Sequence, residues 1–358
     1  MNEELSRLPI SGLESCRGWL AIAAGLLCAC MAAQGSPQYV LQDLGTFGWP
    51  SAEAWGLNDS GTIVGFYRAT SGGPSRAYWW DGAFHDLGPG AAGGVNNSGA
   101  IAGSSAGRAV IWHDGVPTDV GPGGAIDIND IGDIAINDGN RAFVIQNGVR
   151  RVLDPPRTTL GGVSFAYRIN ESAAVVGGGD TDPYPTSHAL VWTDGQHQDL
   201  GTLGGRLSEG QDINDFGIVV GGATDPLGAT HAFYWDGSLH DLGLGGAGGV
   251  NNRGQVVGVL NNPRRAFLYS YLTGSMEFLP DLGYGAAATR INDLGVIVGT
   301  VDIVTDTGRQ THIALWQLVP EAGGLATLGV GLAGFLAVAL RRRSDAGARS
   351  NRCGNPGS

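Results

Sequence analysis

The sequence predicts an all-β protein, a seven-bladed β-propeller closed by its N-terminal strand. Three observations lead to this prediction: an Ile-Asn-Asp-x-Gly motif recurs at a regular period, the same short strand-like runs follow each copy, and the first and last copies are incomplete in complementary ways. A regular period in this range is typical of repeat architectures, in which one small unit is copied and stacked.

The repeated motif has an asparagine at its centre. Successive asparagines lie 38, 33, 41, 44, 37 and 41 residues apart. They are Asn58, Asn96, Asn129, Asn170, Asn214, Asn251 and Asn292. Asn, Asp and Gly tolerate the positive φ of tight turns, so each motif predicts a hairpin turn.

The fifth copy shows the unit most clearly, in residues 210–221, 231–237 and 239–243. Short β-branched or aromatic runs separated by Asn-Asp-x-Gly and Asp-Gly indicate strands joined by hairpins. The part of the chain expected to fold, residues 36–318, has no convincing apolar stripe of helical period, so no helices are expected there. Each unit therefore has four strands: the first ends at Ile-Asn, the second is Gly-x-Val-Val-Gly, the third is His-Ala-Phe-x-Trp and the fourth is x-Asp-Leu-Gly.

The third strand begins with a basic residue in every copy and ends with a large apolar residue that we expect to pack between sheets. The basic residues are Arg76, Arg108, Arg141, His188, His231, Arg265 and His312. A cation at one equivalent position implies a structural partner, and the aspartate of the fourth strand or of the turn is the natural one. The alternative is a ring of cations that captures an anion such as an acidic polysaccharide.

The aspartates of the fourth strand decide the topology. They are Asp43, Asp86, Asp119, Asp154, Asp199, Asp241 and Asp281. The first precedes the first repeat, and the last repeat has none, so residues 39–44 are expected to pair with the strand near Trp316 and close a ring of radial sheets. An open β-solenoid is the competing arrangement.

Both ends of the chain carry targeting features. Trp19 to Met31 is an apolar run after Arg17, which makes residues 1–35 a predicted secretory signal peptide, with lipid attachment at Cys30 as an alternative. Residues 322–340 contain no charge and are long enough to form a transmembrane helix, and Arg341 to Arg343 follow on the cytoplasmic side. We expect the propeller at 36–318 to lie outside and residues 344–358 to be a disordered tail.

Composition agrees with export. Residues 36–319 contain no cysteine, so neither a disulfide framework nor a cysteine metal site is expected there. They carry 28 acidic and 14 arginine residues and no lysine. An acidic surface without basic patches argues against nucleic acid or anionic lipid headgroups as partners.

These motifs resemble a known family. Ile-Asn-Asp-x-Gly-x-Val-Val-Gly, His-Ala-Phe-x-Trp and the segment 199–205 (Asp-Leu-Gly-Thr-Leu-Gly-Gly) are similar to the HAF repeat of bacterial extracellular proteins over residues 39–317. Residues 319–343 resemble the PEP-CTERM sorting signal, through Val319, Pro320 and Glu321 and the basic residues Arg341, Arg342 and Arg343.

The resemblance implies where the protein is delivered, but it implies no established activity. Proteins with such a tail are substrates of exosortase, a membrane enzyme thought to cut near the Pro-Glu, in bacteria that make exopolysaccharide. Two departures bear on sorting here: Ala322 replaces the usual second proline, and fifteen residues follow the arginines.

No catalytic residue is predicted. Ser105 lies in a Gly-x-Ser-x-Gly match, but that chemistry needs a strand-to-helix turn, and none is expected. The Gly-x-Gly-x-x-Gly matches at 243–248 and 329–334 lack a βαβ context. The repeated turns supply at most one carboxylate each, too few for the six to eight oxygens of a calcium site.

The loops between second and third strands are the expected binding surface, because they vary most on a rigid scaffold. The most variable are expected at residues 70–74, 178–187, 222–230 and 301–311. Their acidic residues are candidate ligands for a bridging calcium ion, each weighed against a solvated surface charge. They are Asp180, Asp182, Asp225, Asp302 and Asp306.

The sequence thus predicts an exported, non-catalytic protein of the cell surface or extracellular matrix. Its partners would be an exosortase-like enzyme and exopolysaccharide, with no cofactor, and the C-terminal helix would hold it in the membrane before processing. The alternative is a secreted propeller hydrolase of glycans or esters, which paired inward carboxylates would favour.

Overall fold

The computed structural model describes residues 38–157, 161–183, 185–306 and 308–319. Every regular element among them is a β-strand, so the predicted all-β class is confirmed. Residues Tyr39–Leu318 form one compact unit. The predicted signal peptide, the span at 322–340 and the tail at 344–358 lie outside the described residues, and within those residues no helix is long and apolar enough to cross a membrane.

Most of the strands form four-stranded antiparallel sheets in which sequence neighbours pair, and one sheet has seven strands. The first three sheets contain β2 (Ser51–Leu57), β3 (Ile63–Arg68), β4 (Ser75–Trp80) and β5 (Phe84–Pro89); β6 (Ala91–Val95), β7 (Ile101–Ser105), β8 (Arg108–His113) and β9 (Val116–Pro122); and β10 (Gly124–Ile128), β11 (Ile134–Asp138), β12 (Arg141–Gln146) and β13 (Val149–Leu153).

The next strands are β14 (Ser164–Ile169), β15 (Val175–Thr181), β16 (Thr186–Thr193) and β17 (Gln196–Asp199), followed by β18 (Ser208–Ile213), β19 (Val219–Thr224), β20 (Thr230–Trp235), β21 (Leu239–Val250), β22 (Gln255–Leu260), β23 (Arg265–Ser270) and β24 (Ser275–Phe278). The long strand β21 ends one group of four with its first half and begins the next with its second half.

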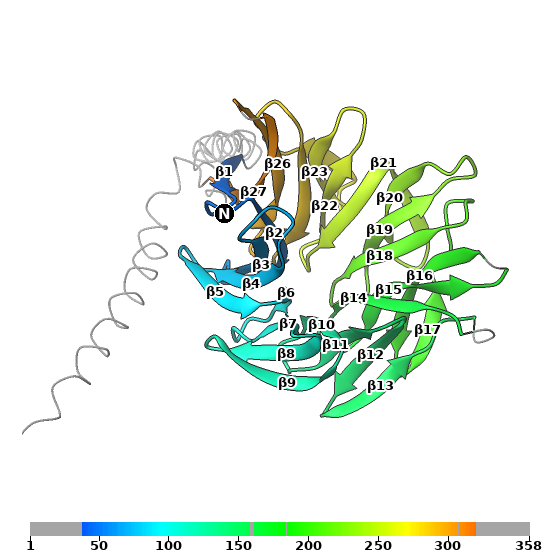
Figure 1. Cartoon of the computed structure of the whole chain (residues 1–358). Coiled ribbons are helices and arrows are strands. Elements are labelled where there is room, and N and C mark those ends of the chain that lie inside the picture. Colours follow the sequence, from blue (N-terminus) through cyan, green and yellow to red (C-terminus); the bar gives the residue numbers. More distant parts are fainter. Residues whose placement is uncertain (1–37, 158–160, 184, 307, 320–358) are drawn as a thin grey trace, which may run out of the picture. The chain divides into compact units, whose positions relative to one another are not determined.

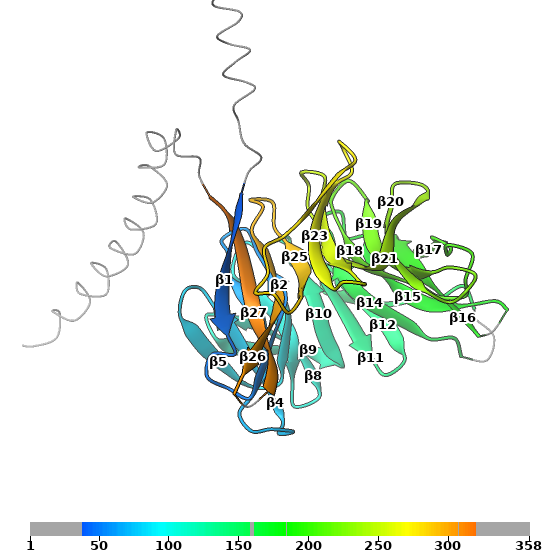
Figure 2. The same cartoon turned by 90° about the horizontal axis from the view of Figure 1, so that it is seen from above.

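The remaining sheet joins the two ends of the unit. It contains β25 (Ala286–Ile291), β26 (Ile297–Thr305), β27 (Gly308–Leu318) and β1 (Tyr39–Gly45). The expected pairing of the N-terminal segment is present, with Leu41 opposite Trp316. The sheets are arranged radially in chain order, and both cartoon views show β1 beside β27 (Figures 1 and 2).

Each first strand carries a β-bulge close to its end. The register shifts by one residue between Ala54 and Gly56 in β2, and an equivalent shift occurs in β6, β10, β14, β18, β21 and β25. A bulge leaves one residue unpaired and bends the strand. The backbone carbonyl groups at these bulges therefore need other partners.

Apolar side chains pack between successive sheets. Ala109 and Trp112 of β8 are both fully buried, and Trp112 packs with Val64 of β3. The alanine at the second position of the third strand is 0 % exposed in all six copies that have it, which explains why no larger residue stands there. Tyr78 of β4 and Leu315 of β27 share a further cluster, so the first and last sheets also pack together.

Two expected loops are shorter than predicted. The segment 301–311 was expected to be irregular, but β26 and β27 continue as a hairpin until Thr305 opposes Gly308. The segment 178–187 is likewise reduced, because β15 and β16 pair as far as Thr181 and Thr186. The added strand residues pair their backbone groups, which a loop would leave to solvent.

Candidate functional site

The repeated asparagines form a circuit of hydrogen bonds at the centre of the compact unit. Each Nδ2 donates to the backbone carbonyl oxygen of the next asparagine over 2.9–3.0 Å, and Asn292 donates to Asn58. Each Oδ1 accepts a backbone N–H from its own turn, as Asn96 does from Ala100 at 2.9 Å. All seven side chains are buried. Asparagine suits this position because it supplies both a donor and an acceptor, and buried polar groups need partners.

A second circuit passes through the residue after each asparagine. Its side-chain oxygen accepts the backbone N–H of the equivalent residue in the preceding copy over 2.7–3.0 Å. The residues are Asp59, Asn97, Asp130, Glu171, Asp215, Asn252 and Asp293. Each of the two amides donates to carboxylates on both sides, as Asn97 does to Asp59 at 3.1 Å and Asp130 at 2.9 Å. This donation reduces the repulsion between neighbouring carboxylates.

These turns surround a cavity of about 300 Å³, which we call the acidic chamber. Seven carboxyl groups and two guanidinium groups line it: Asp59, Asp127, Asp130, Glu171, Asp212, Asp215, Asp293, Arg168 and Arg290. Burial, followed by the neighbouring Asp130 and Asp215 carboxylates, raises the pKa of Glu171. Across the described ranges no group of three or more His, Cys, Asp or Glu residues is arranged to hold a metal ion.

Four charged residues of this central region occupy one repeat position that the sequence analysis did not single out. It is the position two residues before each asparagine, directly after the bulge. The seven copies have Gly56, Gly94, Asp127, Arg168, Asp212, Gly249 and Arg290. Departures from the repeat therefore occur on the first strands of the units as well as in the loops. Aligning the copies at the asparagine would have revealed the change from glycine to charge.

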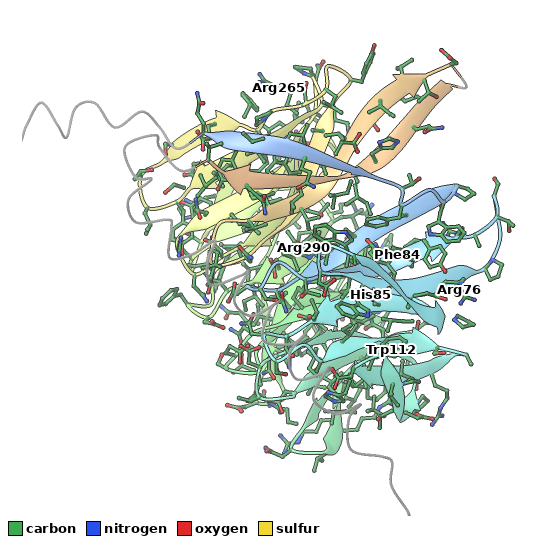
Figure 3. All side chains as sticks on the ribbon, turned by 90° about the vertical axis from the view of Figure 1, so that its left-hand side faces the viewer. Arg76, Phe84, His85, Trp112, Arg265 and Arg290 are labelled. Carbon is green, nitrogen blue, oxygen red and sulfur yellow. The ribbon has the colours of Figure 1, made fainter. Side chains whose placement is uncertain are left out.

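Arg168 and Arg290 satisfy carbonyl groups that the bulges leave unpaired. Arg290 donates from Nε to the carbonyl oxygen of Trp55 at 3.1 Å and from Nη1 to those of Gly248 at 2.6 Å and Thr289 at 2.7 Å. Arg168 also donates to the Trp55 carbonyl oxygen, and to that of Tyr167 at 2.9 Å. In Figure 3, Arg290 lies near the middle of the view, whereas Arg76 lies toward its edge.

Asp127 and Asp212 fix neighbouring first strands to each other. Asp127 Oδ2 accepts the N–H of Ile169 at 3.1 Å, and Asp212 Oδ2 accepts that of Val250 at 3.0 Å. Burial raises the pKa of both carboxyl groups, although Arg168 and Arg290 act in the opposite direction. Burial, together with the charge of Arg168, lowers the pKa of Arg290 to about 9. Surrounding protein thus disfavours the charged form of three of these groups, even though they retain some contact with the solvent of the chamber.

A second cavity, of about 330 Å³, is also lined by the two arginines, and we call it the arginine chamber. It is lined by Trp55, Tyr167, Arg168 and Arg290 together with Ser104, Asn137 and small or apolar residues. No carboxyl group is among the described residues that line it. Trp55 is 41 % exposed, and its ring packs edge-to-face on Phe66 at 4.8 Å.

The basic residues of the third strands pair as predicted in six of the seven copies. Arg108 Nε lies 2.9 Å from Asp119, His231 Nδ1 2.9 Å from Asp241, and Arg76, Arg141, His188 and His312 bind the corresponding aspartates. Arg265 is the exception, because its guanidinium lies 3.8 Å over the ring of Phe278. The alternative of an anion-binding ring at these positions loses its basis, since six of the cations already have a carboxylate.

The five loop aspartates do not come together. Asp302 is buried and accepts from Arg264 at 2.7 Å, Arg309 at 2.6 Å and Thr311 at 2.8 Å. Asp225 accepts two backbone N–H groups of its own loop.

The other loop aspartates have different surroundings. Asp180 accepts the N–H of Val163 at 3.2 Å, Asp182 lies 3.5 Å from Arg157, and Asp306 is exposed. No shared cation site is formed by these residues in the described part of the chain.

Other sequence matches take up structural positions. Ser105 ends β7, and no helix follows it in the described residues. The segment 243–248 lies within β21. Of the sorting residues, Val319 is described and exposed, whereas Pro320, Glu321 and Arg341–Arg343 lie outside the described residues.

Comparisons with known proteins give the fold alone. No protein-family model matches the chain, and a search of curated proteins gives no match. Among solved structures it is similar to the uncomplexed acylaminoacyl peptidase of Pyrococcus horikoshii, with 12 % identity and a TM-score of 0.50. That similarity covers 77 % of this chain and 53 % of the peptidase, so the chain spans about half of that protein.

A chain in the crystal structure of the Mitotic Checkpoint Complex is similar with 8 % identity and a TM-score of 0.52, over 89 % of this chain and 97 % of that one. At such low identity, neither similarity transfers an activity. Together with the radial four-stranded sheets, they identify the fold as a β-propeller.

Proposed function

We propose that the chain is an exported, non-catalytic binding protein, a seven-bladed β-propeller closed by its N-terminal strand. Two contacts support this blade count and closure: β1 pairs with β27, and Asn292 Nδ2 donates to the Asn58 carbonyl oxygen at 2.9 Å. In an open solenoid the first and last repeats have no reason to bind each other.

The observation that carries the binding function is the arginine chamber. Its volume of about 330 Å³ lies within the range of small-molecule sites, and it combines aromatic residues with a few fixed polar groups. Ser104 and Asn137, at the ends of second strands, also line it. It therefore opens toward the variable loops that the sequence marks as the binding surface.

The proposed localisation outside the cell rests on the resemblance to HAF-repeat proteins and to the PEP-CTERM signal. An exosortase-like enzyme would process the C-terminal segment and deliver the propeller to the cell surface or extracellular matrix. There the ligand would be exopolysaccharide, and the protein would act as a binding or scaffolding component. Before processing, the segment 322–340 would hold it in the membrane.

Hydrolysis of glycans or esters is the second candidate. It is favoured by Asp127 and Asp212, two inward carboxyl groups with raised pKa values that line one chamber. Both, however, accept backbone N–H groups of the neighbouring sheet, which is a structural role. Release of reducing sugar by the native chain, and none by an Asp127→Asn variant, would establish the enzyme and refute the non-catalytic proposal.

A glycan array tests the binding function. The segment 36–319 contains the whole compact unit Tyr39–Leu318 and can be applied without its targeting ends. We expect the segment to be retained on a restricted group of bacterial saccharides. The substitution Trp55→Ala should reduce this retention, whereas Arg108→Gln in β8 should leave it unchanged. Failure to retain any saccharide would contradict a glycan-binding role.

A further inference from the structure

Arg168 and Arg290 bring two positive charges to one point. They come from β14 and β25, in different sheets, yet both donate to the carbonyl oxygen of Trp55. Two guanidinium groups that share an acceptor lie side by side. Neither lies within ion-pair distance of a carboxylate in the described residues, unlike six of the seven basic residues of the third strands, although Asp127 and Asp212 act on Arg290 from farther away. An anion placed between them would relieve their mutual repulsion.

The two chambers differ sharply in charge. The acidic chamber contains seven carboxyl groups beside these arginines, and the arginine chamber contains none among its described lining residues. This contrast occurs in a chain whose formal net charge is −12. A cavity lined by two guanidinium groups and by no carboxyl group among its described residues is a favourable location for an anion in an acidic protein.

Both guanidinium groups keep donors for a ligand. No protein acceptor is bound by Nε of Arg168 or by Nη2 of Arg290 in the described part of the molecule, and neither atom is completely buried. The other nitrogen atoms of each guanidinium donate to bulge carbonyl groups, which fixes the planes. Fixed guanidinium planes suit a carboxylate, which accepts two parallel hydrogen bonds.

The rest of the chamber suits a sugar ring. Trp55 and Tyr167 provide aromatic surface, with the indole Nε1 of Trp55 donating to Glu53 at 3.2 Å, and Ser104 adds a hydroxyl group. The side chain of Asn137 is already engaged with the backbone of Ala166 at 2.8 and 2.9 Å, so it shapes the wall. Aromatic rings pack against the C–H faces of sugars, while hydroxyl groups meet polar side chains.

We infer that the arginine chamber binds the carboxylate of an acidic saccharide, a uronic acid residue of the polysaccharide, between Arg168 and Arg290. This inference rests on the proposed binding function and specifies its ligand class. The saccharide ring would lie against Trp55 or Tyr167 with its carboxylate directed inward.

Calorimetry on the segment 36–319 tests the inference with three probes: a glucuronate oligosaccharide, the matching neutral glucose oligosaccharide, and inorganic phosphate. We expect binding of the uronate alone, weakened as NaCl increases. Ser104→Asp places a carboxylate in the chamber without removing any arginine hydrogen bond, and it should weaken binding by about ten-fold or more. Ser104→Asn is the matched neutral control and should retain binding.

Each other outcome overturns a defined part of the idea. Equal binding of the neutral oligosaccharide would refute the carboxylate and leave the proposed function standing. Equal binding of phosphate would refute the saccharide. No binding of any probe would refute the inference, and the glycan array would then decide the proposed function separately. Unchanged uronate affinity in Ser104→Asp, with an unchanged melting temperature, would place the ligand elsewhere.

Discussion

His312 Nδ1 lies 2.9 Å from the carboxylate of Asp43, although 269 positions separate the two residues. The pair repeats the geometry of Arg108 with Asp119 and of His231 with Asp241, which are only 11 and 10 positions apart. The N-terminal strand β1 therefore takes the place that a fourth strand takes in the other sheets. Its contribution to stability should come from the whole strand rather than from this partly exposed contact between two side chains.

Removal of β1 should strongly destabilise the propeller. A variant of residues 46–319 lacks Tyr39, which is 8 % exposed and donates to the Gly295 carbonyl oxygen at 3.1 Å. It also leaves one edge of β27 unpaired. We expect the free energy of unfolding to fall by about 3 kcal/mol or more, with dimers forming through the open edge. Urea unfolding and size-exclusion chromatography measure the two effects.

The single substitution Asp43→Asn is the control for that truncation. An exposed ion pair contributes at most about 1 kcal/mol, and the amide can still accept the N–H of Gly45. A truncated protein as stable as Asp43→Asn would mean that β1 is dispensable and that the closure is wrong.

The asparagine circuit predicts a large effect for a small side chain. Asn96→Ala removes the donation to Asn129 and two acceptor contacts, from Ala100 and Ser98, all buried or partly buried. At about 1 kcal/mol for each hydrogen bond, stability should fall by about 3 kcal/mol. The exposed neighbour offers a comparison, and Asn97→Ala should cost less than half as much. Equal effects in chemical denaturation would contradict the central role of the inner circuit.

One turn carries a residue that its backbone disfavours. Ala173 has φ +61°, where the other six copies have glycine. Left-handed φ costs a side-chain-bearing residue about 1–2 kcal/mol, and glycine gives back part of this through its unfolded-state entropy. Ala173→Gly should therefore stabilise the protein by about 0.5–1 kcal/mol. Gly217→Ala, at φ +77° with no steric neighbour, is the reverse substitution and should destabilise it. Thermal unfolding that ranks the two variants oppositely would refute this account.

The raised pKa of Asp127 predicts a pH dependence. Because the folded state protonates this carboxyl more readily than the unfolded state does, Asp127 opposes folding above its folded pKa. The opposition disappears as pH falls from that value toward 3.8. Asp127→Asn keeps an acceptor for the Ile169 N–H without the charge, so its melting temperature relative to the native protein should be higher at pH 7.5 than at pH 4. A difference independent of pH would mean that the carboxyl group is not destabilised by burial.

The features that recur in every copy of the repeat could be predicted from the sequence. Strand order, turns and the pairing of third-strand cations with fourth-strand aspartates follow from local patterns that each copy restates. Arg265 does not pair for a local reason: Asp281 lies 16 positions later, against 10–13 in the five copies whose aspartate follows in the same repeat, and β24 already ends at Phe278. The longer connection moves the aspartate out of register.

The chambers could not be predicted in the same way, because they depend on where separate copies meet. A β-bulge has no strong sequence signature, and only its register shift turns the following residue inward. Arg168 and Arg290 are separated by 122 residues and become neighbours only when both reach the Trp55 carbonyl oxygen. The glycines of the other copies at this position conceal its importance.

Asp302 provides a final test of how the loop aspartates are used. It is 5 % exposed and bound by Arg264, Arg309 and Thr311, and although burial acts in the opposite direction, these hydrogen bonds and charges hold its pKa below the ordinary value. Asp302→Asn leaves two cations without a counter-charge and should lower stability by about 2 kcal/mol at pH 7. Because a depressed pKa stabilises the fold only above it, this difference should vanish as pH falls through the folded pKa. Asp306→Asn, at an exposed position, is the control and should change little. If instead calcium raises the melting temperature of the native protein and not of Asp302→Asn, the carboxylate is a metal ligand and the structural assignment is wrong.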